Sequence, residues 1–323
     1  MELLSAGEDI IAGKRVREFS RQNDWVSLVW LTGHVGAVGI TGYLVYLTLG
    51  TLWMAPAIFI HGLLVTLLYS PMHECSHGTA FRSRWINETV FWCVCLLYVS
   101  TPTWYRFKHA AHHAHTQIPG KDPDMVLPIP ATSGQYVWYC TGVPMWYRFI
   151  GSLVRHASGR ISPKDYGWLP LVKRPRVILE SRITLAVYAS VGVAAAAFGS
   201  SAPLIYWLIP RLVSEPLLRW LRVAEHVGFA EGSDIRTNTR TTKANPLLRF
   251  FFWNMPYHAE HHLCPSDPFH RLPALHRAVG DQLHETGQGY IAVHRDILRN
   301  HFTYILSVSA NRGMAAKQGT EVR

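Results

Sequence analysis

The chain has 323 residues, a formal net charge of +10 and 49% hydrophobic residues. That apolar content is within the ~45–50% of ordinary soluble domains, so composition alone does not separate soluble from membrane proteins. No basic helix stripe or nucleic-acid-binding motif accompanies the positive charge. We therefore expect no nucleic-acid partner, and we interpret the charge as a basic face that lies on anionic lipid.

The cysteines and the N-terminal segment narrow the class further. Cys75, Cys93, Cys95, Cys140 and Cys264 are odd in number and include no Cys-x-x-Cys pair, which argues against a disulfide framework and a zinc ribbon. Residues 1–24 are charged and have no apolar core followed by a small-residue cleavage site. They predict a cytosolic segment and no secretory signal peptide.

The distribution of charge along the chain predicts membrane spans. No Lys or Arg occurs between Arg21 and Arg82, or between Arg182 and Arg211. A helix needs about 20 apolar residues to cross a bilayer. Four stretches are near this length: residues 25–48, 53–70, 183–198 and 203–221. They predict four transmembrane helices in two hairpins, each of which returns the chain to the cytoplasm.

These observations predict an all-α, polytopic membrane protein with a cytosolic helical cap. Residues 25–280 form the membrane domain, and residues 281–323 form a cytosolic tail. His34 and His61 fall inside predicted spans, where a polar group often marks function. We favour the simpler interpretation that each is neutral and bonds to a neighbouring helix.

Three histidine clusters lie outside the predicted spans, and the first begins three residues after the second span. They are His73-Glu-Cys-Ser-His77, His109-Ala-Ala-His112-His113 and His258-Ala-Glu-His261-His262. Spaced at i, i+3 and i+4, imidazoles sit on one face of a helix, roughly 5–6 Å apart, so they can converge on one point. Eight imidazoles exceed the four ligands of a tetrahedral zinc ion. We therefore predict a two-metal site, and the even number of spans puts all three clusters on the cytoplasmic side.

The ligand type indicates the chemistry. Many imidazoles with few carboxylates favour a redox-active first-row metal. His-Glu-x-x-His alone fits a membrane zinc protease equally well, with Glu74 as general base, but the other two clusters favour the two-metal interpretation. A non-enzymatic metal or haem carrier is a further alternative. At a two-metal site we expect Glu74 and Glu260 to accept a ring N–H and orient a ligand, and Asn254 to bond to a neighbouring ligand.

The three motifs, in this order between paired hydrophobic hairpins, resemble the membrane-bound fatty acid desaturase and hydroxylase superfamily. The resemblance covers about residues 25–280. It implies that the iron ligands are the eight clustered histidines and one histidine after the second hairpin: His73, His77, His109, His112, His113, His226, His258, His261 and His262. Some relatives have an Asn one turn before the ninth histidine. Arg222 occupies that position here, so water or Glu225 would complete the coordination.

A second element of the resemblance follows the middle cluster. Asp122-Pro-Asp124 resembles an Asp-Pro-Asp element of carotenoid-modifying members, where Asp124 would support the ligands. A turn with Asp side chains bonded to the local backbone explains the same residues.

The resemblance implies an O2-dependent di-iron desaturase that introduces a double bond into a fatty acyl or acyl-like chain. A hydroxylase or ketolase of a lipid, carotenoid or other apolar substrate is the alternative. Two electrons would come from an external carrier, because the chain has neither a His-Pro-Gly-Gly haem motif nor a cysteine set for an iron–sulfur cluster. We expect a ferredoxin or cytochrome b5-type donor on the basic face, and a bacterial inner membrane as the location.

Overall fold

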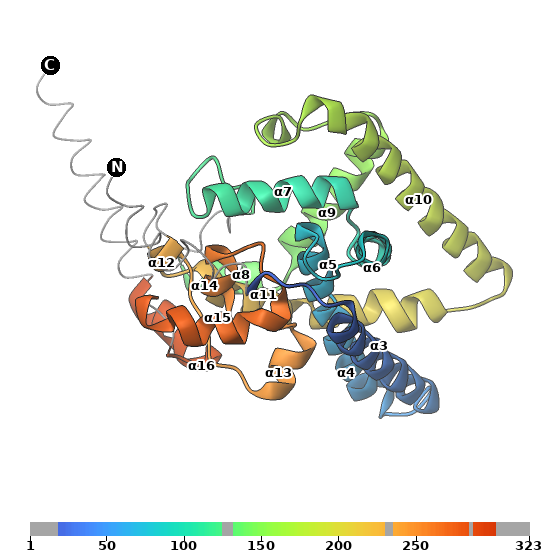
Figure 1. Cartoon of the computed structure of the whole chain (residues 1–323). Coiled ribbons are helices and arrows are strands. Elements are labelled where there is room, and N and C mark those ends of the chain that lie inside the picture. Colours follow the sequence, from blue (N-terminus) through green and yellow to red (C-terminus); the bar gives the residue numbers. More distant parts are fainter. Residues whose placement is uncertain (1–18, 125–131, 230–234, 284–286, 302–323) are drawn as a thin grey trace, which may run out of the picture.

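The computed structural model describes residues 19–124, 132–229, 235–283 and 287–301, which are largely helical (Figure 1). Within these ranges the only extended pairing is a single bridge between Lys243 and Gly289. The predicted all-α fold class is therefore confirmed. Most of the predicted cytosolic segment 1–24 and much of the predicted tail 281–323 lie outside the described residues.

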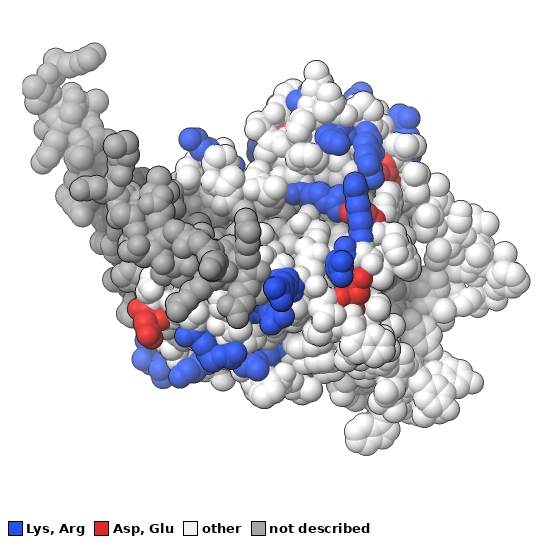
Figure 2. All heavy atoms as spheres, in the orientation of Figure 1, with Lys and Arg blue, Asp and Glu red and all other residues white. Residues whose placement is uncertain are grey.

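Three helices are long and apolar enough to cross a membrane. They are α3 (Asp24–Leu47), α4 (Met54–Leu67) continued by α5 (Tyr69–His77), and η2 (Leu171–Lys173) continued by α10 (Arg174–Ala197). Only 17% of the apolar window of the first helix and 22% of that of the third are buried by protein. α3, α4 and α10 extend to the right of the view in Figure 1, where Figure 2 shows no charged residue at their tips. Apolar surface of this extent is unfavourable in water and fits a lipid environment.

The fourth predicted span, residues 203–221, is not among these three helices. It begins as a π-helix, η3 (Leu204–Leu208), and continues as α11 (Ile209–His226). α11 buries Arg211, Glu215 and Arg219, and the Glu215 carboxylate lies 2.7 Å from a nitrogen of each arginine. Because of these charged residues, α11 does not have the apolar composition of an ordinary membrane-crossing helix. The charged side chains are enclosed by the surrounding helices rather than by lipid.

The segments that carry the histidine clusters meet at the centre of the molecule. α5 holds the first cluster, α7 (Pro102–His115) the second and α14 (His258–Leu263) the third, while His226 ends α11. α7 begins at Pro102, whose fixed φ suits the first position of a helix. The short α14 follows a sharp turn in which Trp253 and Asn254 have φ of 44° and 54°, in the left-handed region. These local features set where α7 and α14 begin, and hence where their histidines lie.

The two histidines inside predicted spans tie helices together, as expected. The Nε2 atom of His34 lies 2.9 Å from the carbonyl oxygen of Leu64, and its Nδ1 atom accepts a hydrogen bond from Trp253. The His61 ring lies 3.0 Å from the Thr41 hydroxyl and 3.1 Å from the carbonyl oxygen of Tyr206. Both rings are buried and belong to the scaffold.

The remaining helices pack around this centre. In chain order they are α6 (Arg84–Leu97), α8 (Ser133–Cys140), α9 (Val143–Ala157), α12 (Ile235–Asn238), α13 (Pro246–Phe251), α15 (Leu272–Val279) and α16 (Tyr290–Asp296).

Candidate metal centre

The nine histidines predicted as ligands lie together in two groups. Within each group the nearest ring nitrogens are all within 4.8 Å of one another. The first group has five members: His73, His77, His109, His113 and His261. The second has four: His112, His226, His258 and His262. The fold thus gathers imidazoles that are up to 189 positions apart in sequence at one buried location.

The helix register divides the second and third clusters between the two groups, whereas convergence on a single point was expected. Residues at i and i+4 share a group, as His109 and His113 do, whereas the i+3 residue His112 belongs to the other group. The same holds for α14, where His258 and His262 share a group and His261 does not. Positions i+3 and i+4 project about 100° apart around a helix. α7 and α14 therefore each contribute to both groups.

The spacing of the ring nitrogens fits bound metal ions. His258 Nε2 lies 2.9 Å from His226 Nε2 and 3.1 Å from His262 Nε2. A single imidazole nitrogen can satisfy one hydrogen-bond partner, not two. Nitrogens about 2.1 Å from one metal ion are ~3.0–3.4 Å apart when the angle between them is about 90–110°. Hydrogen bonding alone does not explain this packing, and shared coordination does.

The first group has the same arrangement. His113 Nε2 lies 3.0 Å from His109 Nε2 and 3.2 Å from His261 Nε2. Two further members, His73 and His77, have buried Nε2 atoms that find no hydrogen-bond partner among the described residues. Buried polar atoms are rarely left unpaired in native proteins, because the lost hydrogen bond costs about 1–3 kcal/mol. Lone pairs directed at a metal ion satisfy these atoms.

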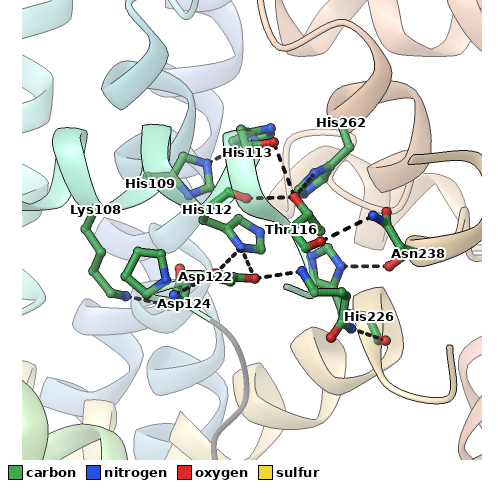
Figure 3. Close-up of polar contacts among 12 residues, drawn as sticks. Lys108, His109, His112, His113, Thr116, Asp122, Asp124, His226, Asn238 and His262 are labelled. Atoms are coloured by element: carbon green, nitrogen blue, oxygen red, sulfur yellow. Dashed lines mark hydrogen bonds and ion pairs between the residues drawn. The ribbon is translucent and has the colours of Figure 1, made fainter. Parts of the chain in front are cut away.

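Several rings are held from behind through Nδ1 (Figure 3). The Asp122 carboxylate lies 2.9 Å from His112 Nδ1, the Thr116 hydroxyl 3.2 Å from His262 Nδ1, and the carbonyl oxygen of Asn238 3.3 Å from His226 Nδ1. Glu74 lies 3.1 Å from His73 Nδ1 in the same way. A carboxylate or carbonyl that accepts the Nδ1 proton leaves the Nε2 lone pair free for a metal.

Burial keeps these rings in the state that binds metal. Burial holds the pKa of His109, and likewise that of His258 and His262, well below its usual value, and neighbouring imidazoles lower it further. These rings are therefore neutral at pH 7, as ligands must be. Burial alone would also lower the pKa of His112, but the charge of Asp122 raises it above its usual value.

The five residues expected to support the ligands differ in what they contact. Glu74 bonds to His73, and a Glu225 carboxylate oxygen lies 3.6 Å from His258 Nε2. Burial raises the pKa of Glu225 to about 7, although Arg222 opposes this. Glu260 accepts hydrogen bonds from Thr241 and His276, which are not in either group. The other two also contact residues outside the groups: Asn254 donates to the carbonyl oxygen of Phe269, and Asp124 pairs with Lys108.

Sequence reasoning missed three of the groups that orient ligands. Asp122 was considered only as part of a motif or turn, whereas its carboxylate accepts from both His112 Nδ1 and the backbone N–H of Gln117. Its position in Asp-Pro-Asp was a usable signal, as was Thr116 one turn after His112. The backbone carbonyl of Asn238 has no sequence signal, because any residue supplies one.

Arg222 takes the place where some desaturase-like proteins have an Asn. Its guanidinium lies 3.2 Å from Glu225, 3.8 Å from Asp124 and 4.8 Å from the centre of the Tyr69 ring. A cation cannot bind a metal ion, so Arg222 instead holds Glu225 beside the second group.

Comparison with known proteins agrees with this geometry. The chain matches the model of the fatty acid desaturase family over residues 62–294, a range that contains all nine histidines. The chain belongs to the fatty acid desaturase family. Its members that resemble this chain are oxidoreductases that act on lipids. Membership of this family replaces the zinc-protease interpretation of the first cluster. A zinc protease would also leave the other seven histidines unexplained.

Individual relatives within the desaturase family are distant. The chain is 26% identical over 268 residues to sphingolipid delta(4)-desaturase DES1 of Drosophila melanogaster, covering 80% of this chain and 75% of that protein. It is 28% identical over 212 residues to sphingolipid delta(4)-desaturase/C4-monooxygenase DES2 of Mus musculus, covering 64% and 59%. It is 26% identical over 242 residues to beta-carotene ketolase of Paracoccus sp., covering 72% and 78%.

Proposed function

We propose that this desaturase-family protein is an O2-dependent di-iron enzyme that introduces a double bond into a fatty acyl or acyl-like chain at the membrane. The observation that carries the proposal is the division of nine imidazoles, seven of them buried, into two adjoining groups of five and four. Nitrogen donors of this kind suit iron. The overall reaction removes two hydrogen atoms from the substrate, consumes O2, two electrons and two protons, and releases two molecules of water.

The chain's own residues prepare the site for this reaction. His73, His112 and the other seven histidines hold the two irons, and bound iron supplies the capacity to activate O2. Glu74 and Asp122 fix the orientation of the rings that they contact. Glu225, which lies against the second group, or a water molecule takes the coordination position that Arg222 leaves open.

The protein crosses the membrane four times in this proposal, with residues 203–221 as the fourth span and the metal centre on the cytoplasmic side. Residues 25–280 are the membrane domain, and residues 1–24 and 281–323 are cytosolic. The uncharged tips of α3, α4 and α10 support this arrangement, since they extend to the same side of the molecule. A bacterial inner membrane is the proposed location.

An acidic electron carrier, a ferredoxin or a cytochrome b5-type protein, docks beside His77. A cavity of about 340 Å³ opens at this ring and is lined by Arg82, Arg84 and Arg106. The first two are exposed, and Arg106 forms an ion pair with Glu88. Figure 2 shows Lys and Arg gathered over the region of α6 and α7. A positive surface of this kind accelerates association with an acidic partner.

The docking proposal is tested with the double variant Arg82→Gln/Arg84→Gln. At low salt we expect the KM for a working ferredoxin or soluble cytochrome b5 to rise several-fold, and its salt dependence to weaken, because rim charges act mainly on association. The matched control is Arg155→Gln/Arg160→Gln, which neutralises two exposed arginines outside this cavity. Unchanged turnover and salt dependence in the first variant would refute this docking site.

A hydroxylase or ketolase of a lipid, carotenoid or other apolar substrate is the second candidate. Two relatives support this candidate, because one is a desaturase/C4-monooxygenase and another a beta-carotene ketolase. Desaturation and hydroxylation both start with abstraction of a hydrogen atom from the substrate, so the same metal centre suits both reactions.

Product analysis tests the proposed reaction. Lipids from a host that expresses the chain are compared by mass spectrometry with those from a host that expresses His261→Ala, and metal is measured on the purified proteins. We expect products that lack two hydrogen atoms, and about two irons per chain in the unaltered protein. Hydroxylated or keto products would favour the second candidate. A single zinc and no new product would reject both.

A further inference from the structure

A polar pocket adjoins the metal centre and has no part in holding the metals. It is a cavity of about 70 Å³ between α5, α7, α9 and α11. One water molecule needs about 10–15 Å³ on this measure, so several waters or one carboxylate or phosphate fit. Its polar walls include Tyr69, Tyr105, Lys108, Asp124, Arg148 and Arg222. We call it the tyrosine–arginine pocket.

The tyrosine–arginine pocket has more cations than carboxylates in its walls. Four cations line it, the fourth being Arg219, against the single carboxylate of Asp124. Lys108 is almost fully buried and pairs with Asp124, while Arg219 pairs with Glu215 outside the pocket. Arg148 forms no ion pair in the described part of the chain and donates one hydrogen bond to the carbonyl oxygen of Pro123. Its remaining N–H groups suit a carboxylate or phosphate.

A hydroxyl adds a hydrogen-bond donor to these charges. The phenol oxygens of Tyr105 and Tyr69 are 3.1 Å apart, so one hydroxyl donates to the other. The second O–H proton has no acceptor within hydrogen-bonding distance among the described residues. A buried donor without an acceptor is unfavourable, and an anion in the pocket would satisfy it.

The same two tyrosines connect the pocket with the first metal group. The Tyr105 ring stacks on His109 with 5.7 Å between ring centres, and the Tyr69 ring lies 6.0 Å from that of His73. Arg222 contacts Glu225, which in turn lies 3.6 Å from His258. An anion in the pocket is therefore separated from the metal ligands by about one aromatic ring.

We infer that the tyrosine–arginine pocket binds an anionic group of the substrate, a carboxylate or a phosphate, close to the metals. This inference rests on the proposed function, because it specifies the substrate of that site. The carbon that is oxidised then lies a short chain away from a charged group. If the oxidised carbon were in the centre of a long acyl chain, far from its polar end, no anionic group would reach these cations.

Binding to the purified, iron-loaded protein in neutral detergent tests the inference without turnover. The probes are octanoate, octyl phosphate and octanol, which share the same eight-carbon chain and differ in head group. The affinity of each probe is measured by its displacement of a radiolabelled anion, octanoate or octyl phosphate. We expect one of the anions to bind at least ten-fold tighter than octanol and to weaken with added salt. The better anion identifies the head group as carboxylate or phosphate.

Two variants place the binding site. Arg148→Gln removes the unpaired and exposed cation and should weaken anion binding about ten-fold. Tyr69→Phe keeps the ring and removes only the hydroxyl, so it should weaken binding by a smaller factor. The control Arg155→Gln lies on the same helix, outside the pocket, and should leave the affinity unchanged.

Each outcome decides the inference. Absence of binding by both anions, equal affinity for octanol and the anions, or full anion affinity in both pocket variants would overturn it. Iron content and lipid products of the same preparations report on the proposed function separately. A protein with two irons and an oxidised lipid product, but without anion preference, would retain the function and lose only this pocket assignment.

Discussion

At the scale of single residues, four of the predicted ligand rings have a polar contact at Nδ1 and leave Nε2 for the proposed metal. His112 illustrates this, since Nδ1 is held by the Asp122 carboxylate at 2.9 Å and the buried Nε2 has no hydrogen-bond partner. A carboxylate behind an imidazole fixes its tautomer and makes the free nitrogen a stronger donor to metal. The orientation of the ring is therefore a property of Asp122 as much as of His112.

We predict that Asp122→Asn lowers metal affinity about 10–100-fold, the range for such supporting residues. The amide retains the shape but lacks the charge that strengthens the imidazole. Iron retention during titration with a chelator measures the effect independently of activity. The control is Asp281→Asn, an exposed position in the 3-10 turn after α15. Equal retention by the Asp122 variant and the unaltered protein would contradict this role.

At the scale of helices, the close packing of α4 against α11 positions His226. Gly62 makes this packing possible, because a Cβ atom there would lie 2.4 Å from the carbonyl oxygen of Pro210 and 2.3 Å from the Ser214 hydroxyl. Arg211 of α11 is buried beside this contact and donates a hydrogen bond to the Thr66 hydroxyl of α4. A side chain at Gly62 must therefore push α11 outward.

We predict that Gly62→Ala destabilises the protein by about 1–3 kcal/mol, the usual range for overpacking. It should also reduce iron content, because His226 moves with α11. Thermal unfolding in detergent and metal analysis are the measurements. Gly39→Ala is the matched control, since nothing lies within 4 Å of a Cβ at that helical glycine, and alanine favours a helix over glycine by up to ~1 kcal/mol. If the two variants have the same midpoint temperature, the close approach is unimportant.

At the scale of the whole molecule, one membrane side must hold all four segments that contribute histidines. The structure meets this geometrically, because α5, α7, α11 and α14 bring their histidines into two adjoining groups. The turns after α3 and α10 lie at the far ends of the apolar helices. Four spans would place both turns on the opposite side of the membrane from the metal centre.

Cysteine labelling in intact cells tests this topology. In a background where the exposed Cys93 is replaced by Ser, we predict that Thr51→Cys and Ser200→Cys react with a membrane-impermeant maleimide. Lys164→Cys, on the side of the metal centre, should react only after lysis. If Ser200→Cys also requires lysis while Thr51→Cys does not, residues 183–221 do not form a second hairpin.

The gathering of the histidines and the apolar, membrane-like helices could be predicted from the sequence by itself. All nine histidines that the structure brings together were named from spacing and from a family resemblance, because a histidine cluster is a local pattern that survives without the fold. The three long apolar helices were predictable for the same reason. The charged α11 was harder, since Arg211 and Glu215 lie in an apolar stretch, and only their burial among helices explains them.

Only the tertiary structure decided how these parts are used. The division of the histidines into groups of five and four depends on the rotation of α7 and α14 about their axes, which motif spacing does not specify. The same rotation places His112 beside Asp122 and directs Glu260 to His276. Asn254, in the turn before α14, donates to the carbonyl oxygen of Phe269 instead. The tyrosine–arginine pocket likewise joins residues from separate helices. Contacts between distant segments are set by packing, so no local pattern in the sequence encodes them.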